Sequence, residues 1–269
     1  MGYRLLDSPA LLLPEEIDLD LATEVIGTKI IHYEQIESTN GKAKEEAGKG
    51  AEEGTIILAE EQTTGKGRIG REFCSPKGGI WLSAILRPDL KAVLATRATY
   101  IVSLAIAKTI DKLTPLEPQI KWPNDILIEG KKVSGILTEM GAEIDQINYL
   151  IVGIGINANF TKAELPTELR DKATTLYHEL DTEIDRVKFV QELLRFIEVI
   201  YAKIADFEAI LTEWKDYAYT LGQKVLITGT KDKIEGRAVD IANDGALIIR
   251  VDGNLKRVYS GDVSLRHQD

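Results

Sequence analysis

The sequence has a single cysteine, Cys74, so no disulfide can form within the chain. Such sparse cysteine fits a reducing compartment, and we expect a cytoplasmic protein. No apolar run reaches the length of a membrane span, and the first residues lack the basic start and apolar core of a signal peptide. We therefore expect no membrane association.

Positive charge is also scarce. The chain has 33 Lys and Arg against 43 Asp and Glu, which gives a formal net charge of -10. General nucleic-acid binding usually needs a basic face, so we expect no DNA partner for this chain. A local basic pocket inside an acidic protein is still allowed.

The chain has enough residues for one large domain, or for a medium domain and a small one. Of its 269 residues, 44% are hydrophobic and 28% are charged, an ordinary globular balance. Internal repeats and low-complexity tracts are absent from the sequence.

The first half of the chain alternates between strand and helix patterns. Residues 29–36, 54–63 and 79–88 are rich in Ile and Leu and predict strands. Ser38 stands where the N-cap of a following helix belongs. Apolar residues recur at helical spacing over 95–113, which predicts a long helix with one buried stripe.

Further along, residues 119–140 and 148–159 each predict a pair of short buried strands joined by a turn. The letters EGKK in the first of these are typical of a hairpin tip. Apolar residues recur every three or four positions in 186–204 and 206–218, which predicts two more helices.

After Leu221 the pattern changes to short alternating strands, with tight-turn signals at 243–245 (NDG) and 252–253 (DG). About fifty such residues suggest a small SH3-like β-barrel. We therefore predict an N-terminal extension over 1–30, punctuated by turns at Pro9 and Pro14, a main domain over 31–220 and a small C-terminal domain over 221–269.

The stretch QTTGKGRIGR, residues 62–71, holds three glycines and three cations, and it matches the pattern G-x-G-x-x-G. A dinucleotide-binding turn needs a helix directly after the glycines, but Ser75-Pro76 and Gly78-Gly79 break helices there. A Walker A loop is excluded because no G-x-x-x-x-G-K-[ST] occurs. Two interpretations remain: a solvated surface loop, or a loop whose backbone N–H groups and cations bind a phosphate or a carboxylate.

Three further stretches carry polar groups beside glycine or turn residues: KWPND (121–125), KKVSGIL (131–137) and VGIGIN (152–157). The first two have structural alternatives: a capped turn with Trp122 in the core for KWPND, and a solvated hairpin lysine at Lys132 for KKVSGIL. Glycine inside a strand weakens it unless another group must come close.

Together these motifs resemble the biotin protein ligases. The order is that of the family: STN (38–40), GKGRIGR (65–71), KWPND (121–125), KVSGIL (132–137) and GIGIN (153–157). The resemblance covers about residues 30–160 by motif, and the C-terminal barrel by pattern.

The resemblance implies an α+β fold, with a mixed β-sheet catalytic domain like the class II aminoacyl-tRNA synthetase core and an SH3-like barrel after it. It implies that biotin and MgATP form biotinyl-5'-AMP, which then acylates one lysine of a biotin carboxyl carrier protein. It also implies a homodimer through sheet edges of the catalytic domain.

The resemblance assigns roles to named positions. Biotin would contact Ser38, Thr39, Asn40, Gln62, Lys66, Gly67, Arg68, Lys132, Gly135 and Gly155. ATP would contact Arg68, Arg71, Phe73, Asn124, Asn157 and Arg266. The catalytic cations would be Lys132, Arg68 and Lys66, and no protein-held metal site is expected; Mg²⁺ would arrive with ATP.

The chain departs from the family pattern at three positions of the glycine stretch. Lys66 and Ile69 stand where arginine is frequent, and Phe73 stands where tryptophan is common. Lysine keeps the charge but not the bidentate fork of arginine. Many bacterial relatives carry an N-terminal DNA-binding domain, and the roughly 30 residues before the first predicted strand are too few for one.

Two other interpretations stay open. A lipoate ligase or octanoyltransferase shares the catalytic fold, and the transferases need a cysteine nucleophile; Cys74 is better explained as packed beside Phe73 and Ser75. A non-catalytic biotin sensor or DNA-binding repressor is disfavoured by the acidic charge.

Overall fold

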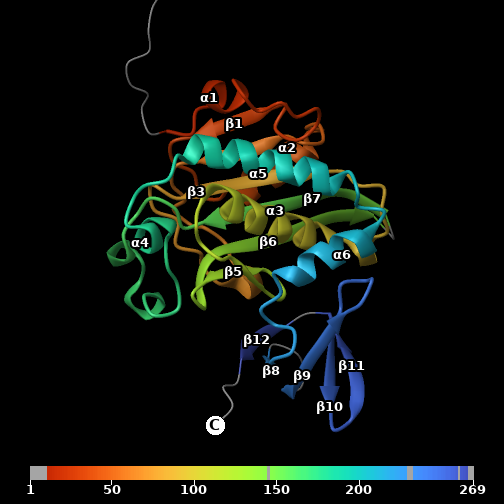
Figure 1. Ribbon diagram of the computed structural model, residues 1–269. Coiled ribbons are helices and arrows are strands. Elements are labelled where there is room, and N and C mark those ends of the chain that lie inside the picture. The colour runs from red at the N-terminus through yellow and green to blue at the C-terminus, as the bar shows by residue number, and fades with distance from the viewer. Residues whose placement is uncertain (1–10, 144–145, 229–232, 260, 266–269) are drawn as a thin grey trace, which may run out of the picture.

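The computed structural model describes residues 11–143, 146–228, 233–259 and 261–265. They form a large mixed sheet flanked by helices and a smaller antiparallel sheet below it (Figure 1). This is an α+β architecture, as the sequence predicts.

The large sheet has seven strands in the order β1-β2-β3-β7-β6-β5-β4. Its strands are β1 (Ile30–Tyr33), β2 (Ile56–Ala59), β3 (Ile80–Leu86), β4 (Gln119–Lys121), β5 (Asp125–Ile128), β6 (Lys131–Glu143) and β7 (Gln146–Ile156). Only β1 and β2 run parallel, because α2 connects them; the other neighbours are antiparallel.

Helices cover both faces of this sheet. The helices are α1 (Pro14–Asp18), α2 (Thr39–Gly48), α3 (Arg97–Leu113), α4 (Leu176–Leu180), α5 (Arg186–Tyr201) and α6 (Phe207–Asp216), with 3-10 turns at Arg68–Gly70, Ala92–Leu94, Lys162–Glu164 and Thr167–Leu169. The short helix α2 packs on β2, β3 and β7, while α3 packs on β4 to β7 and is itself covered by α5 and α6 (Figure 1).

The helix α3 lies inside the main hydrophobic core. Eleven of its 17 residues are buried, so the expectation of a single buried stripe was wrong: the sheet covers one side, and α5 and α6 cover the others. The stretch Ala92–Leu113 is long and apolar enough to cross a membrane by length and composition. Because 61% of its most apolar 18-residue window is buried within the fold, its apolar character is explained by core packing.

The described part of the N-terminal segment packs onto the large domain. Pro14 begins α1 rather than a simple turn, as suits a residue that lacks an N–H at the first helical position. Leu12 and Ile17 are fully buried in the same core as α5. Gln191 of α5 donates hydrogen bonds to the carbonyls of Glu16 and Ile17.

Two strand expectations need correction. Residues 148–159 do not form a pair of strands: β7 runs unbroken from Gln146 to Ile156 because both of its edges are paired, to β3 and β6. Residues 119–140 form β4, β5 and most of β6 rather than one pair. The expected hairpin tip is present as a turn at Glu129 and Gly130, both with positive φ.

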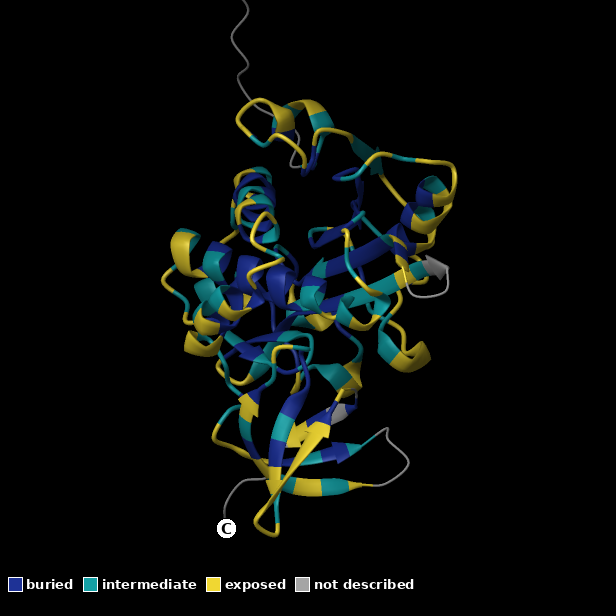
Figure 2. Cartoon of the chain, turned by 90° about the vertical axis from the view of Figure 1, so that its right-hand side faces the viewer, coloured by how far each residue is buried: buried dark blue, intermediate teal, exposed yellow. Residues whose placement is uncertain are grey.

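The smaller sheet has five strands in the order β11-β10-β9-β8-β12. They are β8 (Lys224–Thr228), β9 (Ile234–Ile241), β10 (Leu247–Val251), β11 (Asn254–Val258) and β12 (Asp262–Leu265). Asp252 and Gly253 both have positive φ, which confirms the tight turn at that point. Figure 2 shows the exposed residues of β11 at the outside and the buried strands of the large sheet at the centre.

A buried hydrogen-bond pair joins the two sheets. The hydroxyl of Tyr100, on α3, donates to the carbonyl of Gly245 and accepts from the indole N–H of Trp122, at 2.8 and 2.9 Å. Burial raises the pKa of the Tyr100 hydroxyl above its ordinary value of 10.0. These bonds hold the loop that precedes β10 against the N-terminal end of α3.

Candidate active site

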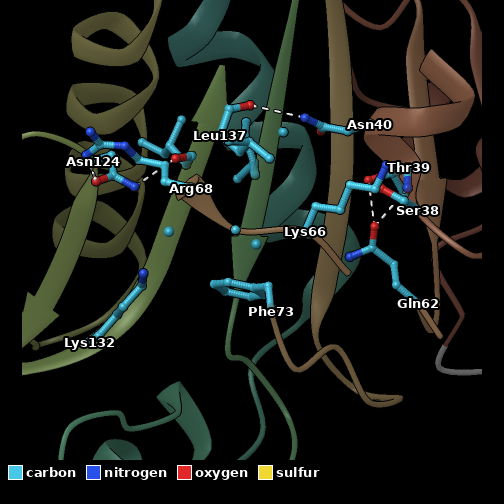
Figure 3. Close-up of a pocket in the computed structure, with 16 residues that line it drawn as sticks. Ser38, Thr39, Asn40, Gln62, Lys66, Arg68, Phe73, Asn124, Lys132 and Leu137 are labelled. Atoms are coloured by element: carbon cyan, nitrogen blue, oxygen red, sulfur yellow. Dashed lines mark hydrogen bonds between the residues drawn. The ribbon is translucent and has the colours of Figure 1, made fainter. Parts of the chain in front are cut away.

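The motifs separated along the chain meet at one cavity beside β6 and β7. Its volume is about 50 Å³, and it is lined by Ser38, Thr39, Asn40, Gln62, Lys66, Gly67, Arg68, Phe73, Asn124, Lys132, Gly135, Ile136, Leu137, Gly153, Ile154 and Gly155 (Figure 3). The structure thus brings together twelve of the residues assigned by resemblance. They come from the start of α2, the segment after β2, the glycine loop, the turn before β5 and the strands β6 and β7.

The N-terminus of α2 supplies the first polar wall. Ser38 has extended backbone angles and caps the helix, with its hydroxyl accepting from the N–H of Gly41 at 3.4 Å. The N–H and hydroxyl of Thr39 both donate to Oε1 of Gln62, at 2.8 and 3.0 Å. The helix start is therefore tied to the segment that follows β2.

The amide of Asn40 is held in one orientation. Its Nδ2 donates to the carboxylate of Glu139 at 2.9 Å and to the carbonyl of Leu137 at 3.3 Å, while its Oδ1 accepts from the hydroxyl of Ser83 at 2.7 Å. Both amide hydrogens are used, so Asn40 offers a ligand only the second lone pair of Oδ1. Asn40 presents an acceptor to the cavity.

Sequence reasoning missed three residues that set this orientation: Ser83, Glu139 and Gly153. A Cβ on Gly153 would lie 2.0 Å from Oδ1 of Asn40, so only glycine leaves room for that side chain. The alternating glycines of the VGIGIN stretch were a signal for a close approach, but nothing in the sequence marked Ser83, a fully buried hydroxyl on β3.

Gln62 connects this wall to the glycine loop. Its Nε2 donates to the hydroxyl of Ser75 at 2.9 Å, and that hydroxyl donates to the carbonyl of Phe73 at 3.0 Å. One Nε2 hydrogen of Gln62 remains for a ligand. The backbone at Gly65 passes close to the backbone at Phe73, and only glycine allows this, since a Cβ on Gly65 would lie 2.3 Å from the Phe73 carbonyl oxygen.

The glycine loop curls back on itself instead of opening a helix. The N–H of Gly67 donates to the carbonyl of Arg71 at 2.7 Å, and a single 3-10 turn follows at Arg68–Gly70, with Ile69 in the left-handed region. No α-helix begins between this turn and β3, which confirms that a dinucleotide-binding turn is excluded.

Two of the expected catalytic cations already have partners within the site. The guanidinium of Arg68 donates to Oδ1 of Asn124 at 2.9 Å, a contact visible in Figure 3. The ammonium of Lys132 lies 2.6 Å from the carboxylate of Asp125. These contacts hold the two cations at one end of the cavity, opposite the polar wall of α2.

Phe73 packs against the sheet glycines. A Cβ on Gly155 or Gly135 would lie 2.6 or 3.0 Å from its ring carbons, so both glycines are needed for its position. Lys132 lies 5.4 Å from the centre of the same ring. We expected biotin rings against these glycines, whereas here the contact comes from Phe73.

Three assigned ATP residues do not line the cavity. Arg71 is exposed to solvent. Asn157 is buried, and its Nδ2 donates to the carbonyl of Thr174 at 2.9 Å, so it joins the end of β7 to the segment before α4. Arg266 lies outside the described residues.

Cys74 does not line the cavity either. Its Sγ lies 3.7 Å from the carbonyl oxygen of Glu164. Burial raises the pKa of the Cys74 thiol above its ordinary value of 9.0, which lowers the thiolate fraction. This is the opposite of what a cysteine nucleophile requires.

Family models match two parts of the chain. A model of the biotin/lipoate A/B protein ligase family matches residues 33–157, and a model of the biotin protein ligase C terminal domain matches residues 220–266. The first match contains every lining residue of the cavity.

Curated proteins and solved structures are similar over most of the chain. The bifunctional ligase/repressor BirA of Bacillus subtilis is 38% identical over 98% of this chain and 82% of its own length. The biotin–[acetyl-CoA-carboxylase] ligase of Mycobacterium tuberculosis is 30% identical over 85% of this chain and 86% of its own. The structure of a biotin protein ligase from Aquifex aeolicus in complex with biotin and ATP is 31% identical, with a TM-score of 0.77 over 90% of this chain and all of that one.

Proposed function

This chain belongs to the biotin protein ligase family, and on that premise we propose a binding or catalytic role for each residue of the cavity. The enzyme activates biotin with MgATP to biotinyl-5'-AMP and transfers the biotin to a lysine of a biotin carboxyl carrier protein. The observation that carries the proposal is the lining of the cavity, with an oriented polar wall at one end and fixed cations at the other. Since small-molecule pockets measure roughly 300 Å³ or more and this cavity about 50 Å³, Phe73 would leave Gly135 and Gly155 to admit biotin.

We assign the polar wall to the ureido ring of biotin. This ring offers two N–H donors and one carbonyl acceptor. Oδ1 of Asn40 accepts from a ureido N–H, while the remaining Nε2 hydrogen of Gln62 and the hydroxyl of Ser38 donate to the ureido oxygen. This assignment uses only donors and acceptors that are not already engaged in the protein's own hydrogen bonds.

We assign the cations to the reacting groups. Adenylation brings a carboxylate against a triphosphate, and their repulsion must be offset while charge builds on the α-phosphate. Lys132 and Arg68 provide this charge from one end of the cavity without a covalent enzyme intermediate. Lys66, which Figure 3 shows on the α2 side of the cavity, would add its charge when the glycine loop moves. Gly67 gives the loop the freedom to close over the adenylate and exclude water.

The nucleotide would contact Arg68, Asn124 and Phe73, the three assigned ATP residues that line the first cavity. Mg²⁺ would come with ATP, and Asn124 would offer it a side-chain oxygen once that oxygen is released from the guanidinium of Arg68. Among the described residues, no group of three His, Cys, Asp or Glu side chains forms a metal site of its own. The roles of Arg71, Asn157 and Arg266 toward ATP remain proposals from family membership.

The test is exchange of labelled pyrophosphate into ATP. We expect exchange to require both biotin and Mg²⁺. Exchange in the absence of biotin, or a covalent biotinyl-enzyme, would contradict this assignment.

A lipoate substrate is the alternative to compare. Its dithiolane ring has no N–H or carbonyl to meet Asn40 and Gln62, so the oriented amides favour biotin. We expect biotin, and not lipoate, to raise the melting temperature; a shift with lipoate alone would reverse the choice.

We also propose the assembly and location of the enzyme. The catalytic domain would cover residues 31–220 and an SH3-like domain residues 221–269, in a cytoplasmic protein that binds no DNA. A homodimer would form through sheet edges: β4 already pairs with the backbone near Ala218, which leaves β1 and the outer edge of β6. Light scattering with biotin and ATP present tests the dimer, and a gel shift at low salt tests DNA binding.

A further inference from the structure

A second cavity lies between the large sheet and the C-terminal sheet. Its volume is about 310 Å³, at the lower end of the range of small-molecule pockets. Tyr100 and Trp122 line it from the core, Thr138 and Met140 line it from β6, and Gly245 and Tyr259 line it from the smaller sheet. None of these residues belongs to the proposed biotin or ATP contacts.

The two cavities adjoin at the cations. Arg68, Asn124, Ile136 and Leu137 line both of them. Strand β5 pairs with β6 only as far as Gly135, so beyond that residue the edge of β6 is flanked by Asn124 and Arg68.

The cavities lie on opposite faces of β6. The side chain of Glu139 contacts Asn40 on the α2 side, whereas the side chain of Thr138 contacts Thr99 of α3 at 2.9 Å. A group in the second cavity therefore reaches the reaction site around the edge of β6.

The chemistry of the second cavity suits an alkyl amine. Apolar and aromatic side chains dominate its lining, Arg68 is its one charged residue, and no carboxylate lines it. Asp244, the nearby acid, is already bound by Arg257 at 2.6 Å and by the hydroxyl of Tyr259 at 3.0 Å. Burial beside a guanidinium disfavours an ammonium and favours the neutral amine, which is the nucleophilic form.

We propose that this cavity admits the side chain of the acceptor lysine, a role that rests on the proposed function. The lysine stem lies along the apolar wall, and its nitrogen arrives as a neutral amine beside Arg68. Its lone pair forms the C–N bond to the acyl carbon of biotinyl-AMP, the C–O bond to phosphate breaks with its electron pair on AMP, and the surplus proton on nitrogen passes to water.

The test narrows the cavity without touching the adenylation residues. Ala95→Phe and Thr138→Phe each place a ring in the cavity, the first from the segment just before α3 and the second from β6. Val93→Phe is the matched control, because Val93 is 65% exposed and does not line the cavity. Two activities are measured for each: biotin-dependent pyrophosphate exchange, and single-turnover transfer from enzyme-bound biotinyl-AMP to a carrier domain.

We expect both narrowed variants to exchange pyrophosphate like wild type and to transfer biotin about tenfold or more slowly, since misplacing a reactant costs that much or more. The control should keep both activities. Unchanged transfer in a variant with normal exchange would overturn the proposal. So would a parallel loss of both activities in variants that melt like wild type, because the cavity would then serve ATP or pyrophosphate. Failure of exchange in the wild-type enzyme would instead refute the proposed function.

Discussion

Lys132→Ala should slow adenylation by a factor on the order of 10²–10³, the effect of removing one preorganised donor that stabilises developing charge. The structure gives a reason for the upper part of that range. The ammonium of Lys132 lies 2.6 Å from the carboxylate of Asp125, so the substitution removes a cation and also leaves an uncompensated anion beside the reacting groups.

The second effect can be sized. Two unit charges 4 Å apart interact by about 4 kcal/mol at an effective dielectric of 20, and by about 1 kcal/mol in water. The side chains of Lys132 and Asp125 are 31% and 23% exposed, so solvent screening places the Asp125 contribution between these limits. Asp125→Asn in the Lys132→Ala background should therefore recover about tenfold of the lost rate.

The assay is biotin-dependent pyrophosphate exchange with saturating biotin and MgATP. Lys131→Ala is the matched control, since Lys131 is the neighbouring lysine on β6 and does not line the cavity. An exchange rate for Lys132→Ala close to that of wild type would refute the role of Lys132. If the double variant were slower than the single one, the argument from the uncompensated carboxylate would be wrong.

Three further predictions address the loop, the polar wall and the stability of the fold. Arg68→Gly should release free biotinyl-AMP because the loop loses its contact with Asn124, so a bystander protein should be labelled more than with wild type; equal labelling would contradict this. Ser83→Ala should raise the KM for biotin about tenfold and leave the KM for ATP unchanged, since the amide of Asn40 loses one of its three hydrogen bonds and Thr39 loses its contact with the same hydroxyl; equal changes in both would point to a general structural role. Burial alone would raise the pKa of Glu198, but backbone N–H donors from Glu24 to Ile26 hold it below its ordinary value of 4.5. This contribution to stability is present above pH 4.5 and is lost as the pH falls through the lowered pKa. Glu198→Gln should therefore destabilise the protein by about 1 kcal/mol at pH 7 and less near pH 4 in urea unfolding; a pH-independent difference would reject the linkage.

Much of the site could be predicted because its residues serve local requirements that leave a pattern in the sequence. Ser38 caps a helix, Gly65 allows a crossing of the backbone, and Gly155 allows a ring to lie on the sheet. Each requirement restricts the residue type at one position. Motifs in the family order were therefore enough to identify twelve residues that line one cavity in the structure.

What the sequence alone determined was therefore the residue types of the cavity, the order of its motifs and the α+β class. Only the tertiary structure decided which groups remain open to a ligand. The donors of Asn40 are used by Glu139 and Leu137, and Ser83 orients its oxygen, across strands that sit far apart in the sequence. The unbroken strand β7 and the second cavity were likewise decided only by the tertiary structure. They depend on which strand lies beside which and on where β5 stops pairing with β6, and such long-range contacts leave no periodic signal in any one segment.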